Sequence, residues 1–211
     1  MDPVAAGLAV LLVTLAAVYG PALGLSPWWV ALAVLLCLGG LSLDAARFGG
    51  RIGHLLAEAL PGGRRRLRRI AIHEAGHCLV AEREALPVCQ VLVGSLACLR
   101  AGLEGCGSTA FEAPGTARLP APELRRWSRV LQAGMVAEQI IFGETARGGA
   151  DDRALLGRLW GLSGFDVETA QREQRQARRE VERLLRHERA GLEERAEALL
   201  RVAPRLWRPA P

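Results

Sequence analysis

The chain of 211 residues begins with two apolar runs, 4–19 and 28–43. The amphipathic segments, which contain charged residues, all follow them. No charged residue stands between Asp2 and Asp44, and the break at 20–27 contains two prolines. Each run reaches the roughly 20 residues of a membrane span once its flanking residues are counted. The pattern therefore predicts a transmembrane hairpin over residues 1–44, with spans at about 4–23 and 27–43.

Beyond residue 65 the apolar positions alternate between helical and strand periods. Helical spacing at 70–80 ends before Pro87, and VCQVLV at 88–93 has the β-branched content of a strand. A more exposed second strand is expected at 107–113. Helical spacing then returns at 122–142, at 154–159 and in a charged amphipathic segment after Asp166, which Gly191 is expected to divide. This pattern predicts a mainly α fold with a small β-hairpin.

Arginine placement indicates how the hairpin is oriented. No arginine precedes Arg47, whereas a cluster at 64–69 follows the second apolar run, so residues 45–65 form a basic juxtamembrane linker. The positive-inside rule then places the C-terminal part in the cytoplasm, and the lack of a positive n-region argues for an uncleaved, multi-pass anchor in the cell membrane. A cluster in this position favours membrane lipid as its partner, with no nucleic acid expected.

Composition narrows the function further. All positive charges behind the net charge of +5 are arginines, because the chain has no lysine. It has no asparagine either, and the two absences together are typical of a bacterial, GC-rich genome. Without lysine there is no GxxxxGK[ST] phosphate loop, which excludes an ordinary nucleotide-hydrolysing motor within this sequence. The five cysteines are odd in number and form no CxxC pair, so we expect reduced thiols in the cytoplasm.

The clearest chemical signal is His-Glu-Ala-Gly-His at 73–77. On a helix, His73 and His77 share one face about 6 Å apart along the axis, close enough to bind one metal ion. Glu74 can then take a proton from water as general base, as in zinc enzymes that hydrolyse peptide bonds. The alternative is a pair of helix histidines that only pack in a core.

A catalytic Zn²⁺ site needs a third protein ligand. The residues after His77 do not continue as xxGxxH, so the ligand must come from elsewhere in the chain. Composition and spacing leave six candidates: Cys78, Glu138, Glu144, Asp151, Asp152 and His187.

Residues 66–203 resemble the peptidase domain of the FtsH-type membrane-anchored zinc metalloproteases. The resemblance begins with the motif at 73–77 and is firmest at 137–143, where AEQIIFG is similar to the family's AEExxFG. RGGADD at 147–152 stands in place of its TGAxND. The resemblance implies a zincin-like helical peptidase domain over 66–203, followed by a tail at 204–211.

The same resemblance implies the roles of the site residues. In the family the last Asp of TGAxND is the third zinc ligand, and that role passes to Asp152. His73 and His77 take the other two ligand positions, and Glu74 takes that of the base.

Departures from the family pattern surround this loop. Met135 stands where the family has the Arg of GGR, and Asp151 replaces the Asn of TGAxND. Asp151 is therefore the alternative metal ligand, ahead of Glu138, which we expect to support the helix from outside the metal's coordination sphere.

The family also places an ATPase domain between its spans and its peptidase, and here about 25 residues separate the two. The resemblance therefore implies a zinc metalloendopeptidase that cuts unfolded or extended protein segments, either without ATP or with a partner ATPase, in a homo-oligomer such as the family's hexamer. Substrate would add as a strand to the edge at 107–113. The alternative is a non-catalytic regulator or adaptor that assembles with membrane proteases.

Overall fold

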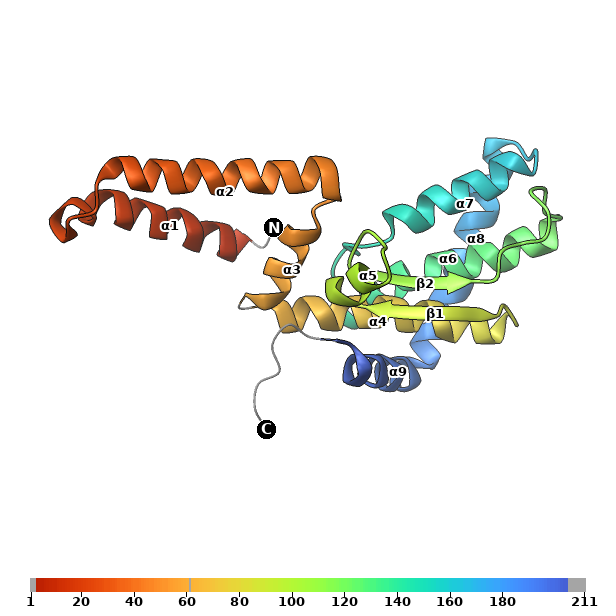
Figure 1. Ribbon diagram of the computed structural model, residues 1–211. Helices are drawn as coiled ribbons and strands as arrows, with labels where there is room; N and C mark the ends of the chain where they lie inside the picture. The colour runs from red at the N-terminus through yellow and green to blue at the C-terminus, as the bar shows by residue number, and fades with distance from the viewer. Residues whose placement is uncertain (1–2, 61, 205–211) are drawn as a thin grey trace.

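The computed structural model describes residues 3–60 and 62–204, and these are mainly helical with one small antiparallel sheet (Figure 1). This confirms the predicted mainly α class with a β-hairpin. Met1, Asp2, Pro61 and the predicted tail at 204–211, except Pro204, lie outside the described residues. The helices are α1 (Pro3–Tyr19), the 3₁₀ turn η1 (Pro21–Leu23), α2 (Pro27–Phe48), α3 (Arg51–Ala59), α4 (Gly63–Arg83), α5 (Ser95–Arg100), α6 (Ala121–Phe142), α7 (Ala150–Leu162), α8 (Val167–His187) and α9 (Arg189–Val202).

The two N-terminal helices form a hairpin that projects to one side of the molecule (Figure 1). In α2, residues Pro27–Arg47 are long and apolar enough to cross a membrane, judged by length and composition. The apolar part identified in α1, Val10–Tyr19, is shorter. Large apolar side chains along both helices are exposed, for example Leu36 at 66%. The second predicted span thus coincides with a helix of sufficient length.

The segment predicted as a basic linker, 45–65, is largely helical. Its central part is α3, and the chain turns into it through Gly49 and Gly50, whose φ angles of +62° and +74° suit glycine. Asp44 is buried, and its carboxylate accepts hydrogen bonds from the first amides of α3, Ile52 N at 3.1 Å and Gly53 N at 2.9 Å. Because Asp44 satisfies these two amides, a helix begins directly after the N-terminal hairpin.

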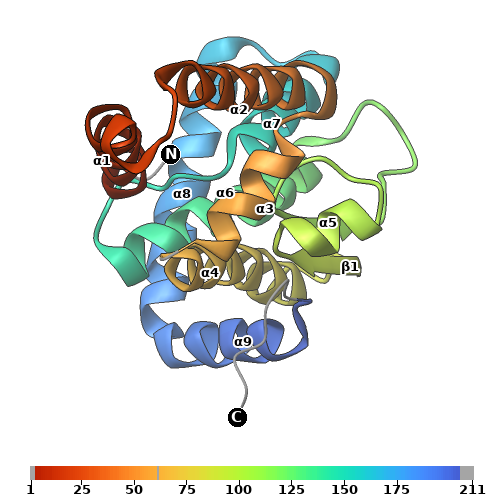
Figure 2. The same cartoon turned by 60° about the vertical axis from the view of Figure 1, so that its left-hand side comes forward.

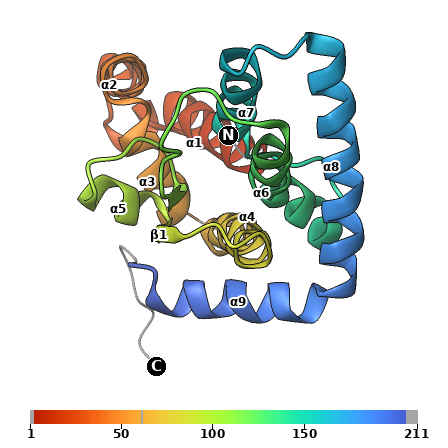
Figure 3. The same ribbon diagram turned by 90° about the vertical axis from the view of Figure 1, so that its right-hand side faces the viewer.

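Helix α4 is the central helix of the remaining chain. It packs against α6 on one side and α9 on another, and in Figure 3 α8 and α9 form a corner around the α4–α6 pair. Its residues 71–81 are all buried. The apolar core between these helices includes Ile72, Val80, Val130, Val136, Val181, Leu185 and Leu192. The HExxH segment therefore lies in the most enclosed part of the molecule.

A second core joins α6, α7 and the start of α8. It contains Trp127 and Trp160, and the indole Nε1 of Trp160 donates a hydrogen bond of 2.9 Å to Ser128 Oγ. This core fixes α7 against α6. It therefore determines where the first turn of α7 lies.

The sheet consists of β1 (Val88–Val93) and β2 (Gly107–Phe111), paired antiparallel from Val93↔Gly107 to Val88↔Phe111 with an irregularity between Val88 and Gln90. Both strands pack on α4. The first predicted strand is confirmed over its full length, and the second ends two residues early, at Phe111.

The predicted division of the C-terminal segment at Gly191 is wrong. The helices separate at Glu188, whose side chain pairs with Arg83 of α4. Gly191 is exposed within α9 and has nothing within 4 Å of an added Cβ. The break is set by packing, because Leu185 and Leu192 on either side of Glu188 both enter the same core.

The close approach of α4 and α6 depends on Gly76. A Cβ there would lie 2.7 Å from Ala137 Cβ and 2.8 Å from the carbonyl oxygen of Ala133. Gly76→Ala should lower the free energy of unfolding of the full chain in detergent by about 1–3 kcal/mol, measured by urea titration.

The matched control is Gly157→Ala on α7, where nothing lies within 4 Å of the added Cβ. There the better helix propensity of alanine should leave stability unchanged or raise it by up to about 1 kcal/mol. Equal effects at the two positions would contradict tight α4–α6 packing.

Candidate metal centre

Two histidines of α4 and one aspartate of α7 meet at a single point. His73 and His77 lie on the same face of α4 with ring centroids 4.8 Å apart. Asp152, in the first turn of α7, places Oδ2 3.1 Å from His73 Nε2 and 3.4 Å from His77 Nε2. The structure thus brings together three of the predicted ligands, whose donor atoms all lie within 4.8 Å of one another.

The spacing of these donor atoms suits a small divalent cation. Around a tetrahedral zinc ion with ligand distances of about 2.0–2.1 Å, neighbouring donor atoms lie roughly 3.3 Å apart. The two nitrogen–oxygen distances, 3.1 and 3.4 Å, bracket that value. Two imidazoles and one carboxylate also form the donor set of many catalytic zinc sites, in which the fourth position stays open.

The outer nitrogen of each histidine is held by a hydrogen-bond acceptor. His73 Nδ1 lies 2.7 Å from Glu138 Oε1, and His77 Nδ1 lies 2.8 Å from the carbonyl oxygen of Val130. In the neutral ring these contacts place the proton on Nδ1 and leave the Nε2 lone pair facing Asp152. Metal-binding histidines are held in this way.

Glu138 connects the two histidines' helix with the loop before α7. Its side chain is buried, and besides His73 it contacts Arg69 at 3.2 Å and accepts hydrogen bonds from the amides of Arg147 (3.1 Å) and Gly148 (3.3 Å). Burial alone would raise its pKa, but the contacts with His73, Arg147 and Arg69 outweigh burial and hold the pKa of Glu138 below its usual value. The ionised Glu138 carboxylate therefore lies against Nδ1 of His73, on the side of the ring away from Asp152.

Gly134 provides the space in which the three donor atoms meet. A Cβ at this position of α6 would lie 2.4 Å from His73 Nε2 and 2.6 Å from His77 Nε2. Any side chain at residue 134 would therefore fill the space between the two Nε2 atoms.

Glu74 lies beside this group and is almost fully buried. Thr109 of β2 donates a hydrogen bond of 2.6 Å from Oγ1 to Glu74 Oε2, and Gly107 lies so close that a Cβ there would be 2.4 Å from Oε1. Burial raises the pKa of the Glu74 carboxyl, although the nearby histidines act in the opposite direction. A carboxylate with a raised pKa is a better proton acceptor, which suits a general base.

The charges of the site attract one another strongly. Burial lowers the pKa of His73, but hydrogen bonds to Asp152 and Glu138 reverse this and raise it to about 10. For Asp152, burial acts to raise the pKa, and the two histidines outweigh it and lower the pKa well below the usual value. The carboxylates thus favour a positive charge on the ring of His73, and the two histidines favour a negative charge on Asp152.

The other candidate ligands lie elsewhere. Asp151 is exposed next to Asp152, and His187 is exposed at the end of α8. Glu144 pairs with Arg69 at 2.8 Å. Cys78 is buried in apolar surroundings that raise the pKa of its thiol to about 11, with the charge of Arg195 on α9 acting against this shift.

Several contributors to the site carry no sequence motif. Thr109 orients Glu74, Gly134 leaves space between the two Nε2 atoms, and the carbonyl of Val130 lies within hydrogen-bond distance of His77 Nδ1. Only Gly134 gave a usable signal, because a glycine inside an otherwise regular helical pattern often marks a close approach. Val130 acts through its backbone, which any residue type provides.

Met135 fills the position at which the resemblance expects an arginine. It is buried, its sulfur accepts a hydrogen bond of 3.0 Å from Arg153, and a Cβ on Gly149 would lie 2.4 Å from its Cγ. Met135 thus packs directly beneath the loop that precedes Asp152. In this chain, side-chain packing and Glu138 together hold that loop.

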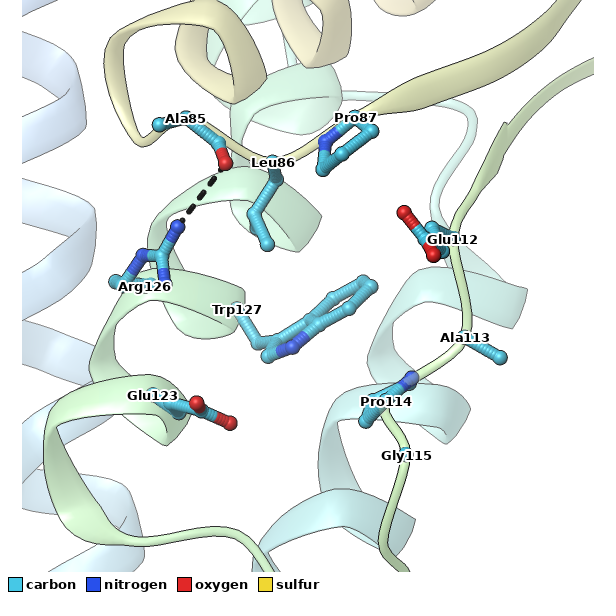
Figure 4. Close-up of a pocket in the computed structure, with 10 residues that line it drawn as sticks. All are labelled: Ala85, Leu86, Pro87, Glu112, Ala113, Pro114, Gly115, Glu123, Arg126 and Trp127. Atoms are coloured by element: carbon cyan, nitrogen blue, oxygen red, sulfur yellow. Dashed lines mark hydrogen bonds between the residues drawn. The ribbon is translucent and has the colours of Figure 1, made fainter.

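A shallow hollow of about 260 Å³ lies beyond Phe111, the last residue of β2 (Figure 4). The Phe111 ring stands between His77 and Trp127, with centroid distances of 6.2 and 5.7 Å. Trp127 lies at the centre of the hollow in Figure 4, between Leu86 and Pro87 above and Pro114 to one side. Through Trp127, the hollow adjoins the Phe111 ring, which in turn contacts His77.

Comparison with known proteins assigns no family to the chain. No protein-family model matches the sequence, and no curated protein matches it.

Substitution of each aspartate should separate the two carboxylates that the sequence left as alternatives. Asp152→Ala removes one of three donor groups, so the purified protein should bind less than a tenth of the zinc of the unaltered chain, measured by elemental analysis after dialysis. Asp151→Ala, one residue away and exposed, should retain full zinc content. The reverse pattern would transfer the ligand role to Asp151.

Glu138 and Glu144 form a second matched pair, because both contact Arg69 and only Glu138 contacts His73. Glu138→Gln should weaken zinc affinity by roughly 10–100-fold, the usual effect of altering an outer partner of a metal-binding histidine. Glu144→Gln should leave it within about twofold. Competition with a zinc-binding dye measures both, and equal affinities for the two variants would show that Glu138 does not orient His73.

Proposed function

We propose that this protein is a membrane-anchored zinc metalloendopeptidase that hydrolyses peptide bonds of unfolded or extended segments on the cytoplasmic side. The observation that carries the proposal is the arrangement of four side chains. His73, His77 and Asp152 direct donor atoms to one point, and the buried carboxylate of Glu74 lies beside that point. A site that only stabilises structure does not require such a base.

Each residue of the site would have a distinct role in hydrolysis. When bound, Zn²⁺ would supply a Lewis acid that polarises the scissile carbonyl and water. Glu74 would accept a proton from the attacking water, and its raised pKa suits that step. Thr109 would hold Oε2 of Glu74, leaving Oε1 to receive the proton. Glu138 and the Val130 carbonyl would keep both imidazoles in their tautomer.

An extended substrate fits the surroundings of the site. β2 carries Thr109 against Glu74 and ends at Phe111 against His77, so a strand added along β2 would pass the four side chains. The hollow around Trp127 would then receive a side chain of the bound segment. A folded domain would not reach His73 and Glu74, which are 8% and 5% exposed.

α2 and the arginines that follow it support the proposed membrane attachment. The 21-residue stretch Pro27–Arg47 would span the bilayer, α1 would complete a two-span anchor, and the arginines of α4 would keep the peptidase domain in the cytoplasm. The likeness of 73–77, 137–143 and 147–152 to the FtsH-type proteases supports a zincin-like domain. It also favours a homo-oligomer, with a separate ATPase where substrates need unfolding.

The direct test uses the full chain in detergent micelles, loaded with zinc, and follows digestion of an unstructured protein by gel and mass spectrometry. The unaltered chain should cleave it. Glu74→Gln should retain zinc but lose at least about a hundredfold in rate, because the general base is gone.

Two controls define the outcome. Glu82 lies on α4 like Glu74 and forms an exposed ion pair with Arg195 of α9, so Glu82→Gln should leave the rate unchanged. Zinc bound in both the unaltered and Glu74→Gln chains without cleavage by either would contradict the peptidase and favour the regulator. Cleavage that survives Glu74→Gln would remove Glu74 from the reaction.

A further inference from the structure

Helix α3 leaves an apolar face uncovered between the membrane hairpin and the catalytic domain. Ile52, Leu56 and Leu60 follow one another at helical spacing and are 54%, 51% and 52% exposed. Two further exposed leucines, Leu99 and Leu103, lie at the end of the neighbouring helix α5 and just beyond it. Exposed apolar side chains arranged on one helix face usually meet an apolar partner.

The opposite face of α3 is fixed to the domain by polar contacts. Glu58 Oε1 accepts hydrogen bonds from the amide of Ser95 (2.8 Å) and from its hydroxyl (2.6 Å), and His54 Nδ1 lies 2.6 Å from Arg66. Together with Asp44, which binds the first amides of α3, these contacts determine which face points outward. The exposed leucines are therefore held in place on the surface.

Several arginines lie on the helices that contact α3. Arg47, Arg64, Arg68 and Arg100 are exposed, and within the described residues none of them forms an ion pair. Arg65 nearby is paired with Glu144. An apolar helix face with such arginines on the neighbouring helices matches a bilayer surface that carries anionic headgroups, because the leucines would enter the acyl boundary and the arginines would bind phosphate.

The position in the fold agrees with this partner. In Figure 1 α3 lies between the hairpin and the domain and runs across the direction of α2. In Figure 2, where that side comes forward, α3, the start of α4 and α5 lie together beneath the end of α2. If α2 crosses the bilayer, its cytoplasmic end places α3 at the level of the headgroups.

We propose that α3, with the end of α5 and the first turns of α4, is an interfacial membrane-binding surface that recognises anionic lipid and fixes the catalytic domain against the bilayer. The surface does not depend on peptidase activity. It rests on the membrane anchoring that forms part of the proposed function.

Photo-crosslinking in the full chain tests this surface. Benzoylphenylalanine replaces Leu36 in α2, Leu56 in α3 or Leu162 at the end of α7, three leucines that are 66%, 51% and 59% exposed. Each variant is placed in nanodiscs that contain phosphatidylglycerol, irradiated and analysed by mass spectrometry. Lipid adducts are expected at positions 36 and 56 and not at 162.

A charge variant distinguishes specific lipid binding from mere proximity to the bilayer. Arg64→Glu combined with Arg68→Glu should lower lipid adducts at position 56 by roughly fivefold or more, while adducts at 36 stay unchanged. Replacing phosphatidylglycerol with phosphatidylcholine should have the same effect in the unaltered chain.

Other outcomes overturn the proposal in distinguishable ways. Adducts at 36 with none at 56 would leave the anchor intact and remove the interfacial surface. Crosslinks from 56 to a second copy of the chain would make α3 a protein interface. No lipid adduct at 36 or 56 would contradict the anchoring itself, and adducts at 56 that ignore both charge changes would refute recognition of anionic lipid.

Discussion

The candidate site depends on the buried carboxylate of Glu138. From α6, Glu138 contacts His73 Nδ1 and Arg69, which both lie on α4. It also accepts hydrogen bonds from the amides of Arg147 and Gly148 in the loop that leads to α7. The Glu138 carboxylate therefore joins three segments that are distant in sequence: α4 at residues 69–73, α6 at residue 138 and the loop at residues 147–148. Burying a carboxylate is costly unless it is fully paired, so this group strongly favours the arrangement in which Asp152 faces the two histidines.

Glycines decide how closely the supporting helices approach. Gly76 lets α4 pack against the backbone of α6, and Gly134 then leaves open the space between the Nε2 atoms. Gly107 does the same for Glu74 beneath β2. The candidate metal centre therefore lies where α4, α6, α7 and β2 are in close contact, and polar groups within this contact are satisfied by one another. Most of the side chains that form the candidate site, namely His73, Glu74, His77 and Glu138, are buried.

Much of this could be predicted from local signals. The Pro-rich start and Gly143 end of α6 predicted its bounds, and β-branched residues predicted β1, because both depend on local preferences. The turn at Glu188 depends on the packing of Leu185 and Leu192 in the core. The start of α3 depends on hydrogen bonds to Asp44. A local sequence pattern does not reveal either contact. At the site, the spacing of His73 and His77 was readable from the motif. The selection of Asp152 over its neighbour Asp151 depends on which carboxylate the first turn of α7 directs inward. The roles of Thr109 and the Val130 carbonyl depend on packing alone.

X-ray absorption at the zinc edge of the zinc-loaded full chain tests the central claim most directly, because it reports the ligands of the ion themselves. A shell of two imidazole nitrogens with one or two oxygens at about 2.0–2.2 Å, and multiple-scattering features from two histidine rings, is the result this account predicts. A shell that contains sulfur at about 2.3 Å, or the scattering of a single imidazole, would contradict a centre formed by His73, His77 and Asp152.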